Sequence, residues 1–220
     1  MTNGQSNADP HALEPVQRIG VGLKQAAGAV IMLHGRGASA TDILNLAPAM
    51  YHPSLAYLAP SAAGHSWYPH SFLAPREQNE PWLSSALKKI ATTIELAKEN
   101  GISEERIVVC GFSQGACLST EYIARHPARY AGLIAFTGGL IGPLGMVMDY
   151  AGDLEGTPAL FGSGDPDPHV PWERVQESAD VIARMQGKVT TRRYPGRAHT
   201  VSADEVRLAK QILAESFGTP

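Results

Sequence analysis

The order of hydrophobic and polar positions along the chain predicts short strands that alternate with helices. Six apolar runs have the length of a strand and are too short for buried helices. Several of them are rich in Val and Ile, which favours strands. We expect these strands at residues 28–33, 55–59, 106–110, 132–136, 158–161 and 189–194.

Helical patterns and helical boundaries occur in the segments between and after these runs. Residues 81–100 place apolar side chains three and four positions apart, and Gly101 follows, where a helix commonly ends in a left-handed residue. Ser202 and Glu205 form a capping box before a helix that runs toward Phe217. Two more helices are expected at residues 114–125 and 171–186.

This alternation predicts an α/β fold with a mostly parallel sheet and helices on both faces. No linker, repeat or low-complexity run divides the chain. We therefore expect one domain over residues 16–220, after a flexible tail at residues 1–15. In such sheets ligands bind at the carboxyl ends of the strands. The loops that follow the strands are thus the places where chemistry is expected.

Composition narrows the class of protein. A chain of 220 residues with 44% hydrophobic side chains is large enough to bury one substantial core. The 18 basic and 21 acidic residues give a net charge of −3, so the chain has no basic field to attract nucleic acid or anionic lipid. There is neither a signal-peptide pattern nor an apolar stretch long enough for a membrane span. We expect a cytoplasmic protein without stable membrane insertion.

The residues that commonly bind metals are sparse. Cys110 and Cys117 are too few for a disulfide framework or a zinc site, and we interpret both as small buried hydrophobes. His65 and His70 have no third ligand at a suitable spacing. The sequence therefore predicts neither a metal nor a cofactor.

A Gly-x-Ser-x-Gly motif at residues 111–115 stands between a predicted strand and a predicted helix, which is the context of a nucleophile elbow. Ser113 is the candidate nucleophile, because a sharp turn would direct its hydroxyl away from the sheet. The same turn leaves the Gln114 amide at the helix N-terminus, where it favours an oxyanion. Side chains in place of Gly111 or Gly115 would collide with neighbouring backbone.

A serine hydroxyl needs a general base, which in this fold follows the nucleophile in the chain. Three histidines come after Ser113. We interpret His126 as a solvated helix end, and His169 shares a turn with the acid candidates and is badly placed to reach the serine. His199, in a loop between the last strand and the last helix, is therefore the predicted base.

The acid that orients the base should follow the strand at residues 158–161. Asp165 and Asp167 both lie there, and each precedes a proline. Spacing alone does not separate them, and the other carboxylate would serve as a turn-making residue.

A glycine-rich turn after the first strand supplies a candidate for the second oxyanion donor. We assign this role to the backbone amide of Arg36, in a turn that opens a helix capped near Ser39 or Thr41. The phosphate-binding glycine patterns are absent, which argues against a nucleotide site.

These motifs together resemble the carboxylesterase/phospholipase family of small α/β-hydrolases that includes the acyl-protein thioesterases. The matching segments are Leu33-His34-Gly35-x-Gly37, Ala59-Pro60, Trp67-Tyr68, Gly111-Phe112-Ser113-Gln114-Gly115, Asp167-Pro-x-Val-Pro171 and His199. The resemblance implies an α/β-hydrolase fold without a large cap domain, and hydrolysis of carboxylic esters or thioesters. It also implies that Asp167 is the acid, with Asp165 in reserve.

Three positions depart from the family pattern. Family members that cleave long acyl thioesters commonly have a leucine where this chain has Arg36. Phe161-Gly162 replaces a His-Gly pair near the acid, and residues 137–140 replace a Ser-Gly-x-Leu-Pro turn. These departures concern the substrate class rather than the reaction type.

The longest irregular stretch, residues 58–82, is rich in aromatic side chains, which make good walls for an acyl or aryl group. Residues 140–150 are the candidate for the opposite wall. The alternative interpretation is that the aromatics anchor the loop in a small core of their own. The predicted substrate-binding residues are Trp67, Tyr68, Phe72, Trp82 and Leu140.

The residues predict a serine hydrolase that cleaves a small-molecule carboxylic ester, short-chain or small aromatic, by two-step acyl transfer. A first alternative is an acyl-protein thioesterase or lysophospholipase acting on long acyl chains, and a lactone is a third substrate type. A different class, a hydrolytically slow ligand receptor, also uses this fold. The sequence leaves a homodimer open.

Overall fold

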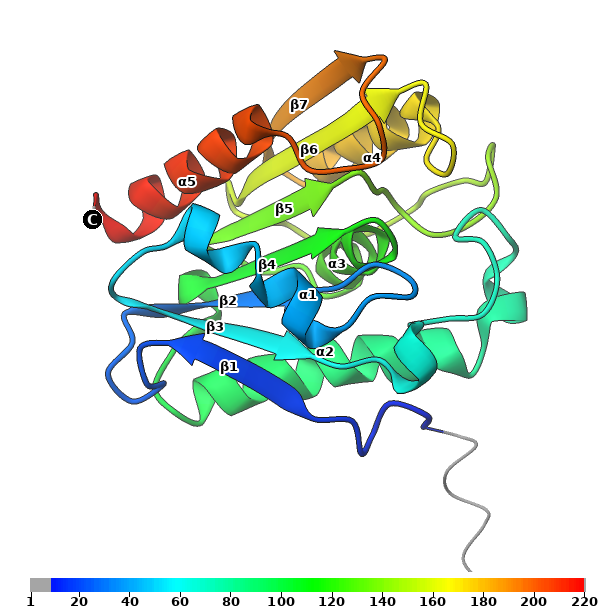
Figure 1. The fold of residues 1–220 in the computed structure, drawn as a ribbon. Helices are drawn as coiled ribbons and strands as arrows, with labels where there is room; N and C mark the ends of the chain where they lie inside the picture. Colours follow the sequence, from blue (N-terminus) through cyan, green and yellow to red (C-terminus); the bar gives the residue numbers. More distant parts are fainter. Residues whose placement is uncertain (1–8, 220) are drawn as a thin grey trace, which may run out of the picture.

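The computed structural model describes residues 9–219 and is built around one seven-stranded sheet (Figure 1). Its strand order is β1-β3-β2-β4-β5-β6-β7. All neighbouring strands are parallel except β1 and β3, which pair antiparallel at one edge. The strands are β1 (Val16–Gly20), β2 (Gly28–Leu33), β3 (Leu55–Pro60), β4 (Ile107–Phe112), β5 (Gly132–Phe136), β6 (Pro158–Asp165) and β7 (Lys188–Pro195).

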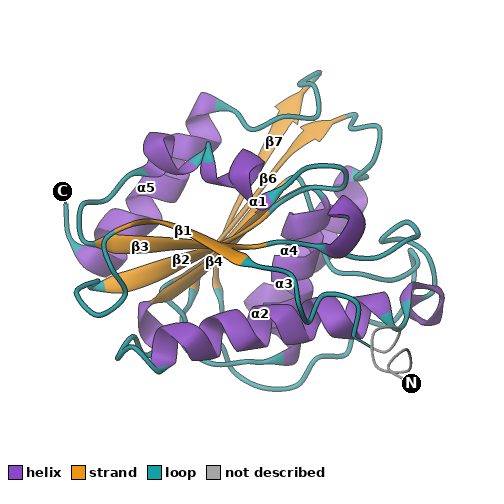
Figure 2. Ribbon diagram, turned by 60° about the horizontal axis from the view of Figure 1, so that its bottom comes forward, coloured by secondary structure: helices purple, strands orange, loops and turns teal. Residues whose placement is uncertain are grey.

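Helices cover both faces of the sheet, as predicted. In Figure 2, α1 and α5 lie on one face while α2, α3 and α4 lie on the other. The helices are α1 (Ala40–Leu44), α2 (Trp82–Lys98), α3 (Gln114–Arg125), α4 (Trp172–Arg184) and α5 (Ala203–Phe217). Short 3₁₀ turns are η1 (Ala47–Met50), η2 (Ala63–His65), η3 (Arg76–Asn79) and η4 (Glu104–Arg106). Within residues 9–219, no helix is both long enough and apolar enough to cross a membrane.

The sheet separates two hydrophobic cores. Along β2, Val30 and Met32 belong to the core that α1 and α5 cover. The alternate residues Ala29, Ile31 and Leu33 belong to the core that α2, α3 and α4 cover. All six residues of β2 are buried, because a central parallel strand is covered on both sides. This double burial is the reason why the central strands are continuous apolar runs in the sequence.

The predicted strands and helices are all present, with small shifts at their ends, but one strand was missed. Four of the five residues of β1 are exposed, so it has no apolar pattern. It forms because the edge of β3 offers unpaired backbone groups, with Val16 opposite Pro60 and Gly20 opposite Ala56.

The predicted flexible tail is too long at its C-terminal end. Residues 1–8 lie outside the described part, but His11 is fully buried. One ring nitrogen of His11, Nε2, lies 2.9 Å from the Trp67 carbonyl, and the other, Nδ1, accepts from the Ala63 amide at 3.0 Å. Asp9 accepts from the Ser85 hydroxyl at 2.6 Å. These contacts hold this segment against residues 58–82, the aromatic loop, and against α2.

Candidate active site

Ser113 stands at a tight turn between β4 and α3. Its backbone angles, φ 55° and ψ −119°, lie in a region that residues other than glycine seldom adopt. The turn is held to β5 because the Ser113 amide donates to the Phe136 carbonyl at 2.9 Å. A Cβ atom on Gly111 would lie 2.3 Å from the backbone of Gly115, and one on Gly115 only 2.1 Å from the Leu33 carbonyl oxygen. The predicted crowding at both glycines is therefore present.

The structure brings three of the predicted site residues into one hydrogen-bonded chain. The Nε2 atom of His199 lies 2.9 Å from the Ser113 hydroxyl, and its Nδ1 atom lies 2.8 Å from Oδ2 of Asp167. A neutral imidazole has one donor and one acceptor nitrogen, so Nδ1 donates to the carboxylate and Nε2 accepts from the serine. In this state the imidazole is ready to receive the serine proton.

Asp167 is held in its charged form. Its fully buried side chain accepts at Oδ1 from the amides of His169 and Val170, both at 2.9 Å. Burial by itself raises the pKa of Asp167, but these two bonds and the one from His199 outweigh it and keep the pKa below its usual value. The carboxylate therefore stays ionised at neutral pH and fixes the imidazole tautomer.

The second acid candidate is turned elsewhere. Asp165 accepts from Nε of Arg193 on the neighbouring strand at 2.5 Å. Asp165 is the last residue of β6 and Asp167 lies two residues beyond it, and the structure places Asp167, and not Asp165, against His199.

The two predicted oxyanion donors border the same cavity as the serine. The Gln114 amide is at the start of α3, where a backbone N–H has no acceptor within the helix. The Gln114 side chain fixes the aromatic loop, because its Oε1 accepts from the Trp67 amide and its Nε2 donates to the Tyr68 carbonyl, both at 2.9 Å. Arg36 lies in the turn between β2 and α1. The oxyanion role of both amides stays a prediction.

A cavity of about 500 Å³ opens above Ser113, and the predicted substrate-binding residues divide there into two groups. Tyr68 and Phe72 line it, but Trp67, Trp82 and Leu140 do not. Trp67 is fully buried below the cavity, where its indole N–H donates to the His34 carbonyl at 2.9 Å. Leu140 is also fully buried, and Trp82 packs against the core. For these three residues the predicted pocket role is wrong, because packing turns them into the core.

The unpredicted residues of the cavity wall include His169 and Cys117. His169 lines the cavity, and its ring meets His199 edge-on with 4.9 Å between the ring centroids. Cys117 lines the cavity one helical turn after Ser113, and burial raises the pKa of its thiol to about 12. The spacing of four residues along α3 was a usable signal for Cys117, since such positions share a helix face.

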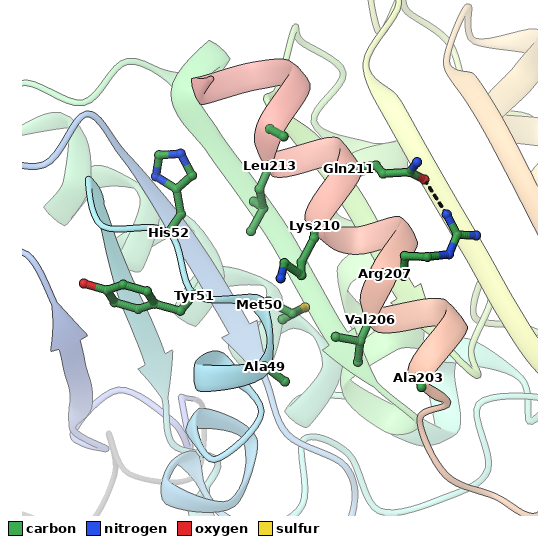
Figure 3. Close-up of a pocket in the computed structure, with 11 residues that line it drawn as sticks. Ala49, Met50, Tyr51, His52, Ala203, Val206, Arg207, Lys210, Gln211 and Leu213 are labelled. Atoms are coloured by element: carbon green, nitrogen blue, oxygen red, sulfur yellow. Dashed lines mark hydrogen bonds between the residues drawn. The ribbon is translucent and has the colours of Figure 1, made fainter. Parts of the chain in front are cut away.

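A second cavity of about 450 Å³ lies between η1 and α5, and Figure 3 shows the residues around it. It shares no lining residue with the cavity above Ser113 and is lined by neither a serine nor a carboxylate. Its polar groups include Lys210 and Arg207. Within the described residues, no group of three or more His, Cys, Asp or Glu side chains could hold a metal ion.

The fold and the site geometry together define an α/β-hydrolase. A mostly parallel sheet carries a serine at a strand-to-helix turn. The imidazole that contacts this serine, and the carboxylate that contacts the imidazole, follow it in the chain order of this class. The chain belongs to the Phospholipase/Carboxylesterase family of serine hydrolases, whose model matches residues 15–216.

The chain is similar to proteins named as carboxylesterases and as an acyl-protein thioesterase. The chain is 45% identical to a phospholipase/carboxylesterase from Dyadobacter fermentans, with a TM-score of 0.88 over 91% of this chain and 96% of that one. It is 27% identical to acyl-protein thioesterase 1 of Cryptococcus neoformans over 86% of this chain and 92% of the relative. A probable carboxylesterase, SOBER1-like, from Arabidopsis thaliana is 25% identical. The matched segment covers 63% of this chain and 53% of that relative.

Proposed function

We propose that the protein is a serine carboxylesterase that hydrolyses short-chain or small aromatic esters through an acyl-enzyme intermediate. The observation that carries this proposal is the chain of hydrogen bonds from Ser113 through His199 to Asp167 at an open cavity. A serine with a neutral imidazole at 2.9 Å and a buried carboxylate behind it is an activated nucleophile.

The geometry supports a two-step mechanism. The Ser113 oxygen attacks the ester carbonyl while His199 Nε2 takes its proton, and Asp167 stabilises the imidazolium. The Arg36 and Gln114 amides hold the oxyanion until it collapses, and His199 gives the proton to the leaving alcohol. Water then attacks the acyl-enzyme, again with His199 as base, and the acid leaves with Ser113 restored.

The first test removes the nucleophile and the base. We expect Ser113→Ala and His199→Ala each to lower turnover of p-nitrophenyl acetate on the order of 10⁴-fold. Ser103→Ala, at an exposed serine that does not line the cavity, is the matched control and should keep wild-type turnover. Wild-type turnover in either active-site variant would contradict the proposal.

A fluorophosphonate separates an esterase from a slow receptor. We expect stoichiometric labelling of Ser113 in the wild-type protein, because the reagent reports an activated serine. An unlabelled protein that still binds small esters would favour the receptor.

The second candidate function is hydrolysis of long acyl thioesters or of lysophospholipids. The name of the fungal relative, acyl-protein thioesterase 1, favours a thioester among these substrates. A cavity of about 500 Å³ with polar groups at its wall supports the smaller substrate. A series of p-nitrophenyl esters decides between them. We expect kcat/KM to fall above about four to six acyl carbons, and a rise toward long chains would favour the thioesterase.

A further inference from the structure

The lining of the catalytic cavity is basic. Besides His199, its lining holds Arg36, His70 and His169, and no carboxylate. Asp167 lies behind the imidazole with a fully buried side chain, and its oxygens already accept three hydrogen bonds. A substrate anion in this cavity would therefore face no negatively charged side chain in the lining.

Arg36 is a cation at this cavity whose guanidinium is fixed by hydrogen bonds to neutral groups. Its side chain is exposed, and within the described residues no carboxylate lies within 4.0 Å of it. The guanidinium donates to the Ser66 hydroxyl at 3.1 Å and to the carbonyls of Pro69 and His70 at 2.8 and 2.6 Å. An arginine has five N–H donors, so these three bonds leave others for a ligand.

The reaction geometry assigns this cation to one part of the substrate. The leaving oxygen must lie near His199 Nε2, which protonates it, and the carbonyl oxygen must lie near the two backbone amides. The acyl group is then left with the wall formed by Tyr68, Phe72 and Cys117. The Arg36 guanidinium lies over the ring of Tyr68, 5.9 Å from its centroid, and so stands on the acyl side.

Resting on the esterase function proposed above, we propose that the preferred substrates are esters whose short acyl group ends in a carboxylate, and that Arg36 binds this carboxylate. Half-esters of small dicarboxylic acids are the chemical class. Charge-assisted bonds from a guanidinium to a carboxylate are strong and directional. A long apolar chain along the same wall would instead strip water from the cation.

Two substrates of nearly equal shape test the charge alone. Monoethyl glutarate carries the carboxylate, and ethyl glutaramate replaces it with a neutral amide. Hydrolysis of both is followed by base titration at neutral pH, and the readout is the ratio of their kcat/KM values. We expect the anion to be preferred about tenfold in the wild-type protein, as for a hydrogen bond to a charged group, and less at high salt.

Variants of Arg36 separate charge recognition from support of the loop. Arg36→Gln keeps the backbone amide but removes the charge, and we expect its kcat/KM ratio to be near one. Arg36→Lys keeps the charge and should keep part of the preference for the anion. If Arg36 only supports the loop, Arg36→Gln lowers kcat/KM for both substrates by the same factor, and the ratio of the two values does not change. Arg18→Gln, on exposed β1, is the control and should keep the wild-type ratio.

The outcomes also separate this inference from the esterase function. A ratio at or below one in the wild-type protein, or an unchanged ratio in Arg36→Gln, overturns the role of Arg36 while Ser113-dependent turnover of p-nitrophenyl acetate upholds the esterase. Absence of Ser113-dependent turnover of any of these esters overturns both.

Discussion

Asp165 and Asp167 have the same side chain and lie two residues apart at the end of β6, yet their contacts differ. Asp167 receives two backbone amides and the His199 ring, whereas Asp165 faces Arg193 across to β7. Two residues along the chain thus separate a carboxylate that contacts the His199 ring from one that ties β6 to β7.

This difference predicts opposite outcomes for the same substitution. Asp167→Asn should lower kcat/KM for p-nitrophenyl acetate about 10³-fold or more, because a neutral amide neither fixes the tautomer nor stabilises the imidazolium. Asp165→Asn, its matched control, should stay within a few-fold of wild type. Steady-state kinetics on both variants provides the check. Equal losses, or a larger loss at Asp165, would remove Asp167 from the mechanism.

Cys117 borders the cavity, but its chemistry is suppressed. Burial raises the pKa of the thiol to about 12, so at mildly alkaline pH almost none of it is thiolate, the form that reacts. We expect iodoacetamide to leave the native protein fully active and Cys117 unmodified by mass spectrometry. The same treatment after denaturation should alkylate both Cys110 and Cys117. Rapid inactivation of the folded protein would contradict this interpretation.

At the scale of elements, the approach of α3 to β2 depends on a glycine. The Leu33 carbonyl oxygen occupies the space where a Cβ atom of residue 115 would lie, at 2.1 Å. Because backbone atoms on both sides must move, Gly115→Ala should lower the free energy of unfolding by about 1–3 kcal/mol and displace Ser113 from His199. Denaturant unfolding and esterase kinetics measure the two effects.

Gly22→Ala is the control for this glycine. A Cβ atom there would meet only the end of the flexible Gln25 side chain, at 2.7 Å, so we expect little change in stability or activity. If Gly115→Ala matched this control in both measurements, the close approach of α3 to β2 would not matter for the site.

For the whole molecule, two buried histidines link stability to pH. Burial lowers the pKa of His11 and His34 from the usual 6.5, although each has a bond to a backbone carbonyl that opposes the shift. In both rings one nitrogen also accepts a backbone amide, from Ala63 to His11 and from Ala62 to His34. Protonation would remove that acceptor, so the folded protein holds both rings neutral.

The sign of the pH effect follows from these contacts. Below about pH 6.5 the unfolded chain binds protons that the folded chain excludes, so stability is complete above this pH and falls as the pH decreases. We expect the free energy of unfolding, measured by urea titration, to fall between neutral pH and about pH 5, by at most about 1.4 kcal/mol per pH unit for each histidine, and the urea midpoint to fall with it. The drop should be smaller in His34→Gln and unchanged in His70→Gln. A midpoint independent of pH in this range would show that neither ring titrates on unfolding.

The sequence by itself was sufficient for the central elements and the reactive turn, because both depend on local patterns. A strand such as β2 is buried on both faces, so its sequence is one apolar run. The glycines around Ser113 are needed because a sharp strand-to-helix turn leaves no space for side chains there. The order of nucleophile, acid and base along the chain left three histidines, and the local context of the other two was enough to favour His199.

Only the tertiary structure decided which neighbours in the sequence face the substrate. Trp67 and Tyr68 are adjacent, yet the Trp67 indole is buried against the turn after β2 and Tyr68 lines the cavity. The exposed edge strand β1 exists because β3 needs a partner. Such outcomes depend on which distant groups remain to be covered or hydrogen-bonded, a condition that no local pattern of residues contains.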